Sequence, residues 1–235
     1  MLFRELSIQP IPYHDELNPI LWQDNKLKTE IRYKLLYIAQ HFARFLNIPK
    51  LNLRDITISG SNAAYGYSDS SDLDLHLLVE IPNDRLELVE LYDAKKNQYN
   101  SKYDIKIKTI PVELYVQDVN QAHASAGIYS VLDDKWIKEP KYGPPKINDD
   151  EVKSKARNYS SRLNKALKLD DLDFAKETMA DIRRLRQAGL ESGGEFSIEN
   201  LAFKLLRSKG KIDKLRRHID KLQSADLSIG EKYED

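Results

Sequence analysis

The chain has 235 residues, and its 37 Lys and Arg residues balance 37 Asp and Glu residues. This neutrality excludes a protein-wide electrostatic attraction to nucleic acid or to a membrane, and the absence of cysteine excludes disulfides, thiolate zinc sites and a cysteine nucleophile. The sequence shows neither the pattern of a signal peptide nor an apolar run of the roughly 18 residues that a membrane span needs. We therefore expect a cytoplasmic protein with no membrane partner.

The N-terminal part predicts an irregular arm followed by an amphipathic helix. Residues 1 to about 15 contain Pro10 and Pro12 and show little periodicity, which favours an arm laid over the domain. Between about Asn25 and Asn47, apolar residues recur mostly at spacings of three and four. This is the pattern of a helix with one buried face.

The next part of the chain alternates strand-like and helical segments. Strand-like runs are expected at residues 56–59, 72–79, 103–109 and 112–117, with a helix at about 83–99. Strands interleaved with helices predict an α/β (α+β) fold, in which helices flank a mixed sheet and cover one of its faces.

The C-terminal third of the chain predicts a helical subdomain. Residues 139–150 contain three prolines and a glycine, which predict a linker. The expected helices lie at 151–169, 173–188 and 198–222, with breaks at Gly189, at the Gly193 and Gly194 pair, and at Gly210. We therefore divide the chain into a domain at 1–140, a linker at 141–150 and a helical subdomain at 151–235.

Two aspartates stand at the start of the strand-like run SDLDLHLLV, residues 71–79. Alternation along a strand puts Asp72, Asp74 and His76 on one face, and Leu73, Leu75, Leu77 and Val79 on the other. Carboxylates this close repel each other unless a cation lies between them, and Mg²⁺ prefers carboxylate oxygens. The pair suits a metal clamp, although taken alone it is more typical of a solvent-facing strand end with two solubilising aspartates. We expect His76 to be structural.

A Gly-Ser pair precedes these aspartates. Gly60 and Ser61 follow the apolar strand at 56–59 and are separated from Asp72 by the ten residues 62–71. A turn without a side chain lets backbone N–H groups and a hydroxyl approach phosphate oxygens. Asn62, the next residue, either hydrogen-bonds a phosphate or caps the loop. The order strand, Gly-Ser, short loop and Asp-x-Asp strand is far more specific than either pair alone.

This order resembles the signature of the DNA polymerase β-like nucleotidyltransferase superfamily, in which Gly-Ser is followed by Asp-apolar-Asp-apolar. The resemblance covers roughly residues 50 to 120, and the wider chain is similar to predicted nucleotidyltransferases encoded by tailed phages. It implies a nucleotidyltransferase-type sheet and a third acidic residue between apolar neighbours on a later strand. Glu113 in IPVELYV matches this pattern, and Asp104 is the competing candidate.

The resemblance also implies a reaction and a set of roles. A nucleoside monophosphate would pass from a nucleoside triphosphate, ATP among the candidates, to an acceptor hydroxyl. The catalytic residues, and ligands of two Mg²⁺ or Mn²⁺ ions, would be Asp72, Asp74 and Glu113. The nucleotide phosphates would be bound by Gly60, Ser61 and Asn62.

The sequence leaves the acceptor open between an RNA 3′ end such as that of tRNA, a protein side chain and a small molecule. The basic segment 205–222 is either a track for an RNA phosphate backbone or a solvated helix face with Asp213 and Asp220 interleaved, and our preference for RNA rests on it. Loop 62–71 has no Lys or Arg, so part of the triphosphate charge has to be met from elsewhere. Candidates in the helical subdomain are Lys153, Lys155, Arg157, Lys204 and Arg207. The alternative from another class is a non-catalytic, nucleotide-binding regulatory module, and the sequence predicts no oligomeric state.

Overall fold

The computed structural model of the chain describes residues 12–48, 51–69, 71–82, 85, 87–121, 125–143 and 146–229. These residues fall into two compact units, one before residue 144 and one from residue 146 onward. Within the described ranges, no helix has both the length and the apolar character that a membrane crossing requires. Most of the expected N-terminal arm, residues 1–11, lies outside the described residues.

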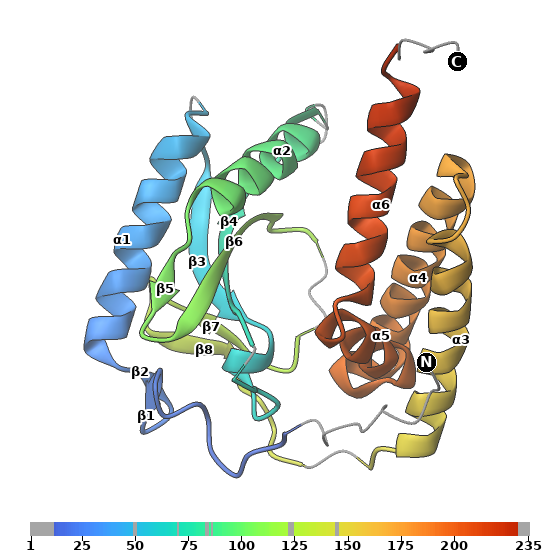
Figure 1. The fold of residues 1–235 in the computed structure, drawn as a ribbon. Helices are drawn as coiled ribbons and strands as arrows, with labels where there is room; N and C mark the ends of the chain where they lie inside the picture. The colour runs from blue at the N-terminus through green and yellow to red at the C-terminus, as the bar shows by residue number, and fades with distance from the viewer. Residues whose placement is uncertain are drawn as a thin grey trace, which may run out of the picture. The chain divides into compact units, whose positions relative to one another are not determined.

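The first unit is built on a six-stranded mixed sheet with the strand order β5-β6-β4-β3-β7-β8 (Figure 1). The strands are β3 Leu53–Ser59, β4 Leu73–Val79, β5 Lys106–Ile107, β6 Ile110–Asp118, β7 Ile128–Ser130 and β8 Lys135–Lys138. Strands β4 and β6 are parallel, and the other neighbouring pairs of this sheet are antiparallel. The predicted mixed sheet with flanking helices is therefore confirmed.

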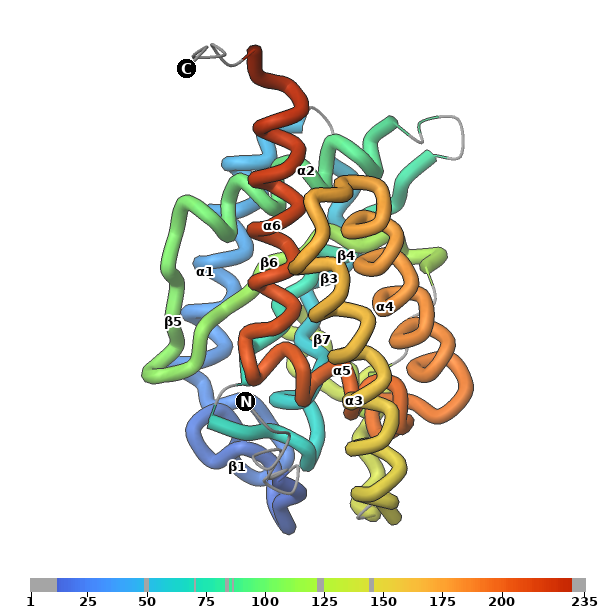
Figure 2. Tube along the Cα trace, turned by 45° about the vertical axis from the view of Figure 1, so that its right-hand side comes forward, coloured from blue at the N-terminus to red at the C-terminus, as the bar shows by residue number. Residues whose placement is uncertain are grey.

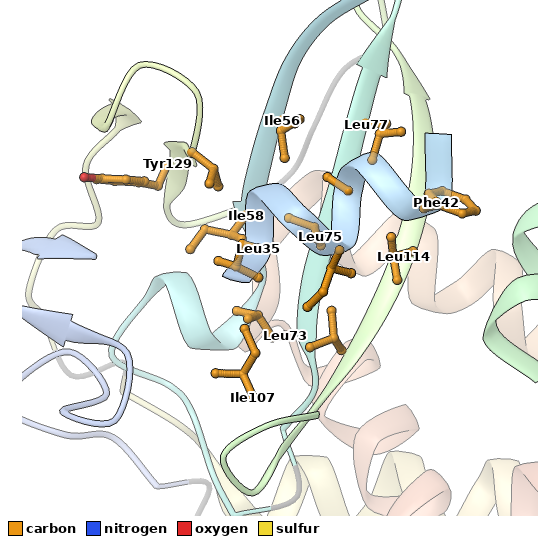
Figure 3. Close-up of a cluster of buried hydrophobic side chains, with 14 of the residues drawn as sticks. Leu35, Phe42, Ile56, Ile58, Leu73, Leu75, Leu77, Ile107, Leu114 and Tyr129 are labelled. Carbon is orange, nitrogen blue, oxygen red and sulfur yellow. The ribbon is translucent and has the colours of Figure 1, made fainter. Parts of the chain in front are cut away.

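Helix α1, Thr29–Leu46, covers one face of this sheet, and its apolar side chains face the strands (Figure 3). On β4, alternate residues Leu73, Leu75 and Leu77 are fully buried against it. Helix α2, Glu87–Lys102, adds Tyr92 and Tyr99 to the same core. Because side chains alternate along a strand, Asp74 and His76 point to the opposite side of the sheet.

The expected helix at 25–47 is right in kind but begins at Thr29. The residues before it form a small hairpin of β1, Trp22–Gln23, and β2, Lys26–Leu27. Its two turn residues, Asp24 and Asn25, have φ values of 49° and 59°. Two successive residues of positive φ, a conformation that Asn and Asp tolerate, are typical of a tight two-residue hairpin turn. The turn therefore prevents the helix from starting at Asn25.

Two other expectations for the sheet need correction. The run at 103–109 contributes only Lys106–Ile107 as β5, because Lys108 turns the chain back toward β6 with a φ of 56°. Strands β7 and β8 were not expected. They have three and four residues, which is too short for an alternating pattern to stand out from the loops around them.

The second unit contains four α-helices with a core of their own. They are α3 Asp149–Ala166, α4 Leu172–Gly193, α5 Ile198–Ser208 and α6 Lys211–Asp226. Helices α3, α4 and α6 run beside one another, and the shorter α5 packs on them (Figures 1 and 2). Helix α3 begins inside the expected linker, because the side chain of Asn148 caps it by accepting a hydrogen bond from the backbone N–H of Glu151.

Gly189 does not end a helix, contrary to the expectation. Helix α4 continues through it to Gly193, and Gly194, with a φ of 70°, follows the helix end. Gly189 is buried, and a Cβ atom there would lie 2.6 Å from Glu199 Cβ and 2.8 Å from Ser197 Oγ. Position 189 therefore requires a glycine, because the start of α5 packs too closely against α4 for a side chain to fit. Gly210, with a φ of 65°, does separate α5 from α6 as expected.

We predict that Gly189→Val destabilises the second unit by about 1 to 3 kcal/mol, because the added methyl groups must displace the start of α5. Urea unfolding followed by far-UV circular dichroism measures the change. The matched control is Ala188→Val, at the exposed neighbouring position of the same helix. It should cost about 0.5 kcal/mol, the helix propensity difference. Equal losses in the two variants would contradict the packing role of Gly189.

Candidate functional site

The strand directions bring the sequence motifs to one edge of the sheet. Because β3 is antiparallel to β4, the end of β3 lies beside the beginning of β4. Because β6 is parallel to β4, its beginning lies at the same edge. The Gly60 turn that follows β3, Asp72 before β4 and Glu113 near the start of β6 therefore meet there, although Gly60 and Glu113 are more than fifty positions apart in the chain.

The register of the strands places Asp74 in the middle of this edge. Asp74 pairs with Ser59 of β3 on one side and with Glu113 of β6 on the other. Neighbouring strands lie about 4.8 Å apart, so two carboxylate-bearing residues stand side by side. Asp72 lies two residues earlier, about 6.6 Å along the chain. Asp72, Asp74 and Glu113 are all half-buried.

Asp104, the competing third carboxylate, lies in a different setting. It precedes the edge strand β5, and its side chain is 78% exposed and forms an ion pair of 2.8 Å with Lys106. Glu113 instead pairs directly with Asp74 in the sheet register. The geometry therefore favours Glu113 as the partner of the aspartate pair.

Gly60 lies directly against the Asp74 carboxylate. Its φ of 75° and ψ of −161° fall in a region that is essentially restricted to glycine. A Cβ atom added at Gly60 would lie 2.0 Å from Asp74 Oδ2. Glycine is therefore required twice, once for the backbone conformation and once for the space that the carboxylate occupies.

A second segment supports the Gly60 turn from behind. The Gly60 N–H donates to Ser125 Oγ at 3.0 Å, and the Ser125 hydroxyl donates to the Gly127 carbonyl at 2.8 Å. Lys138 Nζ in turn donates to the Ser125 carbonyl at 2.6 Å. The structure therefore brings a cation close to the turn, although the loop 62–71 contains none. The sequence offered no signal for Ser125 or Lys138, because this contact joins segments distant in the chain.

Asn62 uses its side chain within the protein. It is 1% exposed, and its amide nitrogen donates to the carbonyls of Ser71, at 3.3 Å, and Asp72, at 2.8 Å. Its side-chain oxygen accepts a hydrogen bond of 2.8 Å from Asn18. An Asn amide has two N–H donors, so both are engaged. Of the two interpretations of Asn62, the structure favours the loop cap, which holds the backbone of Asp72 in place.

Behind the carboxylates lies a second pair of residues on the same face of the sheet. His76 of β4 pairs in register with Tyr115 of β6, and their rings stack with centroids 4.9 Å apart and an interplanar angle of 18°. His76 is buried and shares a hydrogen bond of 3.1 Å with the Ser59 hydroxyl. These contacts agree with a structural role for His76.

Tyr115 connects this second pair to the carboxylates. Its hydroxyl donates a hydrogen bond to Glu113 Oε2. Burial, the charges of Asp74, Glu113 and Asp72, and the bond to Glu113 all raise the pKa of Tyr115 far above its ordinary value. The hydroxyl therefore remains a donor at neutral pH. The same effect shows that all three carboxylates lie within electrostatic range of one side chain.

Lys96 of α2 lies near this group of acidic residues. Its Nζ atom is 5.3 Å from the centroid of the Tyr115 ring and 3.0 Å from Asp93 Oδ1. Sequence analysis named neither Lys96 nor Tyr115. Tyr115 had a usable signal, because it follows Glu113 by two residues and so shares its face of the strand. Lys96 had none, because the position of α2 over β6 depends on tertiary packing.

The donor atoms at this edge suit a hard divalent cation, because Mg²⁺ prefers carboxylate oxygens. The Asp74 carboxylate also occupies space that a side chain at residue 60 would fill, so the site needs the glycine. Among the described residues, however, no three His, Cys, Asp or Glu side chains are gathered closely enough to hold a metal ion by themselves. Mg²⁺ is usually bound through one or two carboxylates together with waters and substrate phosphates, and Asp72 and Asp74 fit that pattern.

Comparison with known proteins adds little to this geometry. No protein-family model matches the chain, and no curated protein matches it either. Among solved structures, the chain is similar to a STING-associated CdnE c-di-GMP synthase from Capnocytophaga granulosa. The alignment covers 85% of this chain and 84% of that one, with 13% sequence identity and a TM-score of 0.25.

We predict that Gly60→Ala destabilises the first unit by about 1 to 3 kcal/mol, the range for a residue forced into a glycine-only conformation. The added Cβ atom also has to push the Asp74 side chain away. Urea unfolding gives the magnitude. The matched control is Gly143→Ala, since a Cβ atom there would meet no atom within 4 Å. A variant at Gly60 as stable as the one at Gly143 would contradict this account of the turn.

Proposed function

We propose that this protein is a metal-dependent nucleotidyltransferase, which moves a nucleoside monophosphate from a nucleoside triphosphate to an acceptor hydroxyl. One observation carries the proposal. The register of three adjacent strands brings together the Gly60 turn, the Asp72 and Asp74 pair, and Glu113. A glycine turn beside paired carboxylates suits a triphosphate and the divalent cation that accompanies it.

In this proposal, Asp72 and Asp74 hold the divalent cation and Glu113 is the third carboxylate. When bound, Mg²⁺ or Mn²⁺ neutralises charge on the triphosphate and lowers the pKa of the acceptor hydroxyl. The strands hold the carboxylates in place before substrate arrives, because Leu73 and Leu75 anchor β4 in the core. Fixed positions favour transfer, since phosphoryl chemistry depends mainly on positioning and electrostatic stabilisation.

The Gly60 and Ser61 turn is our candidate for the β- and γ-phosphates. Its backbone is shaped by the glycine conformation and supported by Ser125. Lys138, which is held near this turn through the Ser125 carbonyl, would offset part of the triphosphate charge. Asn62 supports the site indirectly by fixing the backbone of Asp72.

An RNA 3′ end is our proposed acceptor, and the second unit supports this choice. Helix α6 buries Ile212 and Leu215 in the helical core. Exposed basic residues on α6 and just before it are Lys209, Lys214, Arg216, Arg217 and Lys221. Such a surface suits a phosphate backbone. Of these side chains, Arg216 lies 3.8 Å from Asp213, so its charge is partly offset.

The test of the reaction uses Asp74→Asn, which keeps the size of the side chain against Gly60 and removes its charge. Wild-type protein incubated with α-labelled nucleoside triphosphates, Mn²⁺ or Mg²⁺, and total RNA should transfer label to RNA. The activity of the variant should fall by more than about 100-fold. A loss of this size exceeds the effect of removing a residue that only hydrogen-bonds to a metal ligand. Label in protein or in small molecules would identify a different acceptor.

Two further variants decide the third carboxylate. Glu113→Gln should lose activity as Asp74→Asn does, whereas Asp104→Asn should keep it, because Asp104 is exposed and paired with Lys106. The reverse result would assign the role to Asp104. Full transfer by Asp74→Asn would overturn the proposed function. Nucleotide binding without transfer to any fraction would support the non-catalytic regulatory module instead.

A further inference from the structure

Two residues behind the candidate carboxylates, His76 and Tyr115, take no part in the proposed reaction. Its position is defined by the sheet, because His76 and Tyr115 follow Asp74 and Glu113 by two residues on the same two strands. Both side chains therefore project from the same face as the carboxylates. A tyrosine is not a ligand that Mg²⁺ prefers, so its role has to be an indirect one.

The Tyr115 ring is held in place by its surroundings. It stacks on the ring of His76 of β4, with the ring centroids 4.9 Å apart. His76 in turn shares a hydrogen bond of 3.1 Å with the Ser59 hydroxyl of β3. From α2, the Lys96 ammonium group lies 5.3 Å from the ring centroid. A ring held by contacts from β4 and α2 presents its hydroxyl in one direction, toward Glu113.

The Tyr115 hydroxyl donates a hydrogen bond to Glu113 Oε2, and this bond links the ring to the candidate site. A glutamate side chain has one more rotatable bond than an aspartate and is correspondingly harder to keep in one position. Glu113 therefore needs an external restraint more than Asp72 and Asp74 do. Carboxylates that bind metals are commonly held in this way by a hydrogen-bonding partner.

We propose that Tyr115 is a positioning residue, which holds the Glu113 carboxylate through Oε2 on the face of the sheet that carries Asp74 and leaves Oε1 to reach, through a bound water, the cation that Asp72 and Asp74 would hold. This inference rests on the proposed function, because it assigns Glu113 a part in metal binding. It goes further by explaining how the longer glutamate can serve at a position beside two aspartates. The competing explanation is that the hydrogen bond only stabilises the fold.

The test measures binding of Mn²⁺ alone, by electron paramagnetic resonance of the free ion, to the full chain without nucleotide. Tyr115→Phe removes the hydroxyl and keeps the ring that stacks on His76. It should weaken Mn²⁺ binding by about 10- to 100-fold, the usual effect of removing a partner of a metal ligand. In the label-transfer assay the same variant should lower kcat more than it raises the KM for nucleotide.

The matched control is Tyr129→Phe. Tyr129 is a buried tyrosine of the same sheet, and like the half-buried Tyr115 its hydroxyl donates to a carboxylate, that of Asp134 at 2.8 Å. It lies on β7, which β3 separates from the carboxylate-bearing strands β4 and β6. This variant should lose stability comparably and bind Mn²⁺ like the wild type. The comparison separates an effect on the site from a general loss of stability.

A double variant tests whether Tyr115 acts through Glu113. If it does, Tyr115→Phe combined with Glu113→Gln should bind Mn²⁺ no more weakly than Glu113→Gln alone. Additive losses, or wild-type affinity in Tyr115→Phe, would overturn the inference and leave the proposed function standing. Wild-type protein that binds Mn²⁺ no better than Asp74→Asn, both without nucleotide and with a nucleoside triphosphate present, would overturn both.

Discussion

The pairing of β4 with β3 on one side and with β6 on the other is the constraint on which the rest of the first unit depends. The fully buried leucines of β4 face α1, and a shift of one residue would bury Asp74 and expose Leu75. The burial of apolar surface therefore fixes the register of the sheet. The same register sets Asp74 between Ser59 and Glu113, so the core and the candidate site are two faces of one arrangement.

Placing like charges side by side costs free energy, and the structure shows what surrounds them. Gly60 leaves room for the Asp74 carboxylate, the Tyr115 hydroxyl donates to Glu113, and the Asn62 amide holds the Asp72 backbone. These three features leave room for one carboxylate, restrain a second and fix the backbone that carries the third. Such preorganisation is what a reaction based on charge stabilisation needs, because the groups need not rearrange when substrate binds.

The glycines of this chain illustrate how one residue type serves different physical needs. Gly60 combines a glycine-only conformation with a close contact to a carboxylate. Gly194 and Gly210 have positive φ next to helix ends. Gly189 lies within α4 and has no side chain because α5 approaches closely. A glycine in a sequence therefore marks a constraint without revealing whether it concerns the backbone or the packing.

The sequence by itself determined the alternating faces of β4, the main helices and the order of Gly-Ser and Asp-x-Asp, because these are local patterns of hydrophobicity and turn chemistry. It did not determine the short strands β7 and β8, the hairpin before α1 or the passage of α4 through Gly189. Only the tertiary structure decided that Glu113 pairs with Asp74, that Asn62 is engaged within the loop, and that Tyr115 and Lys96 lie near the carboxylates. Each of these arrangements depends on contacts between segments distant in the chain. Local sequence patterns do not indicate which of those segments will pair.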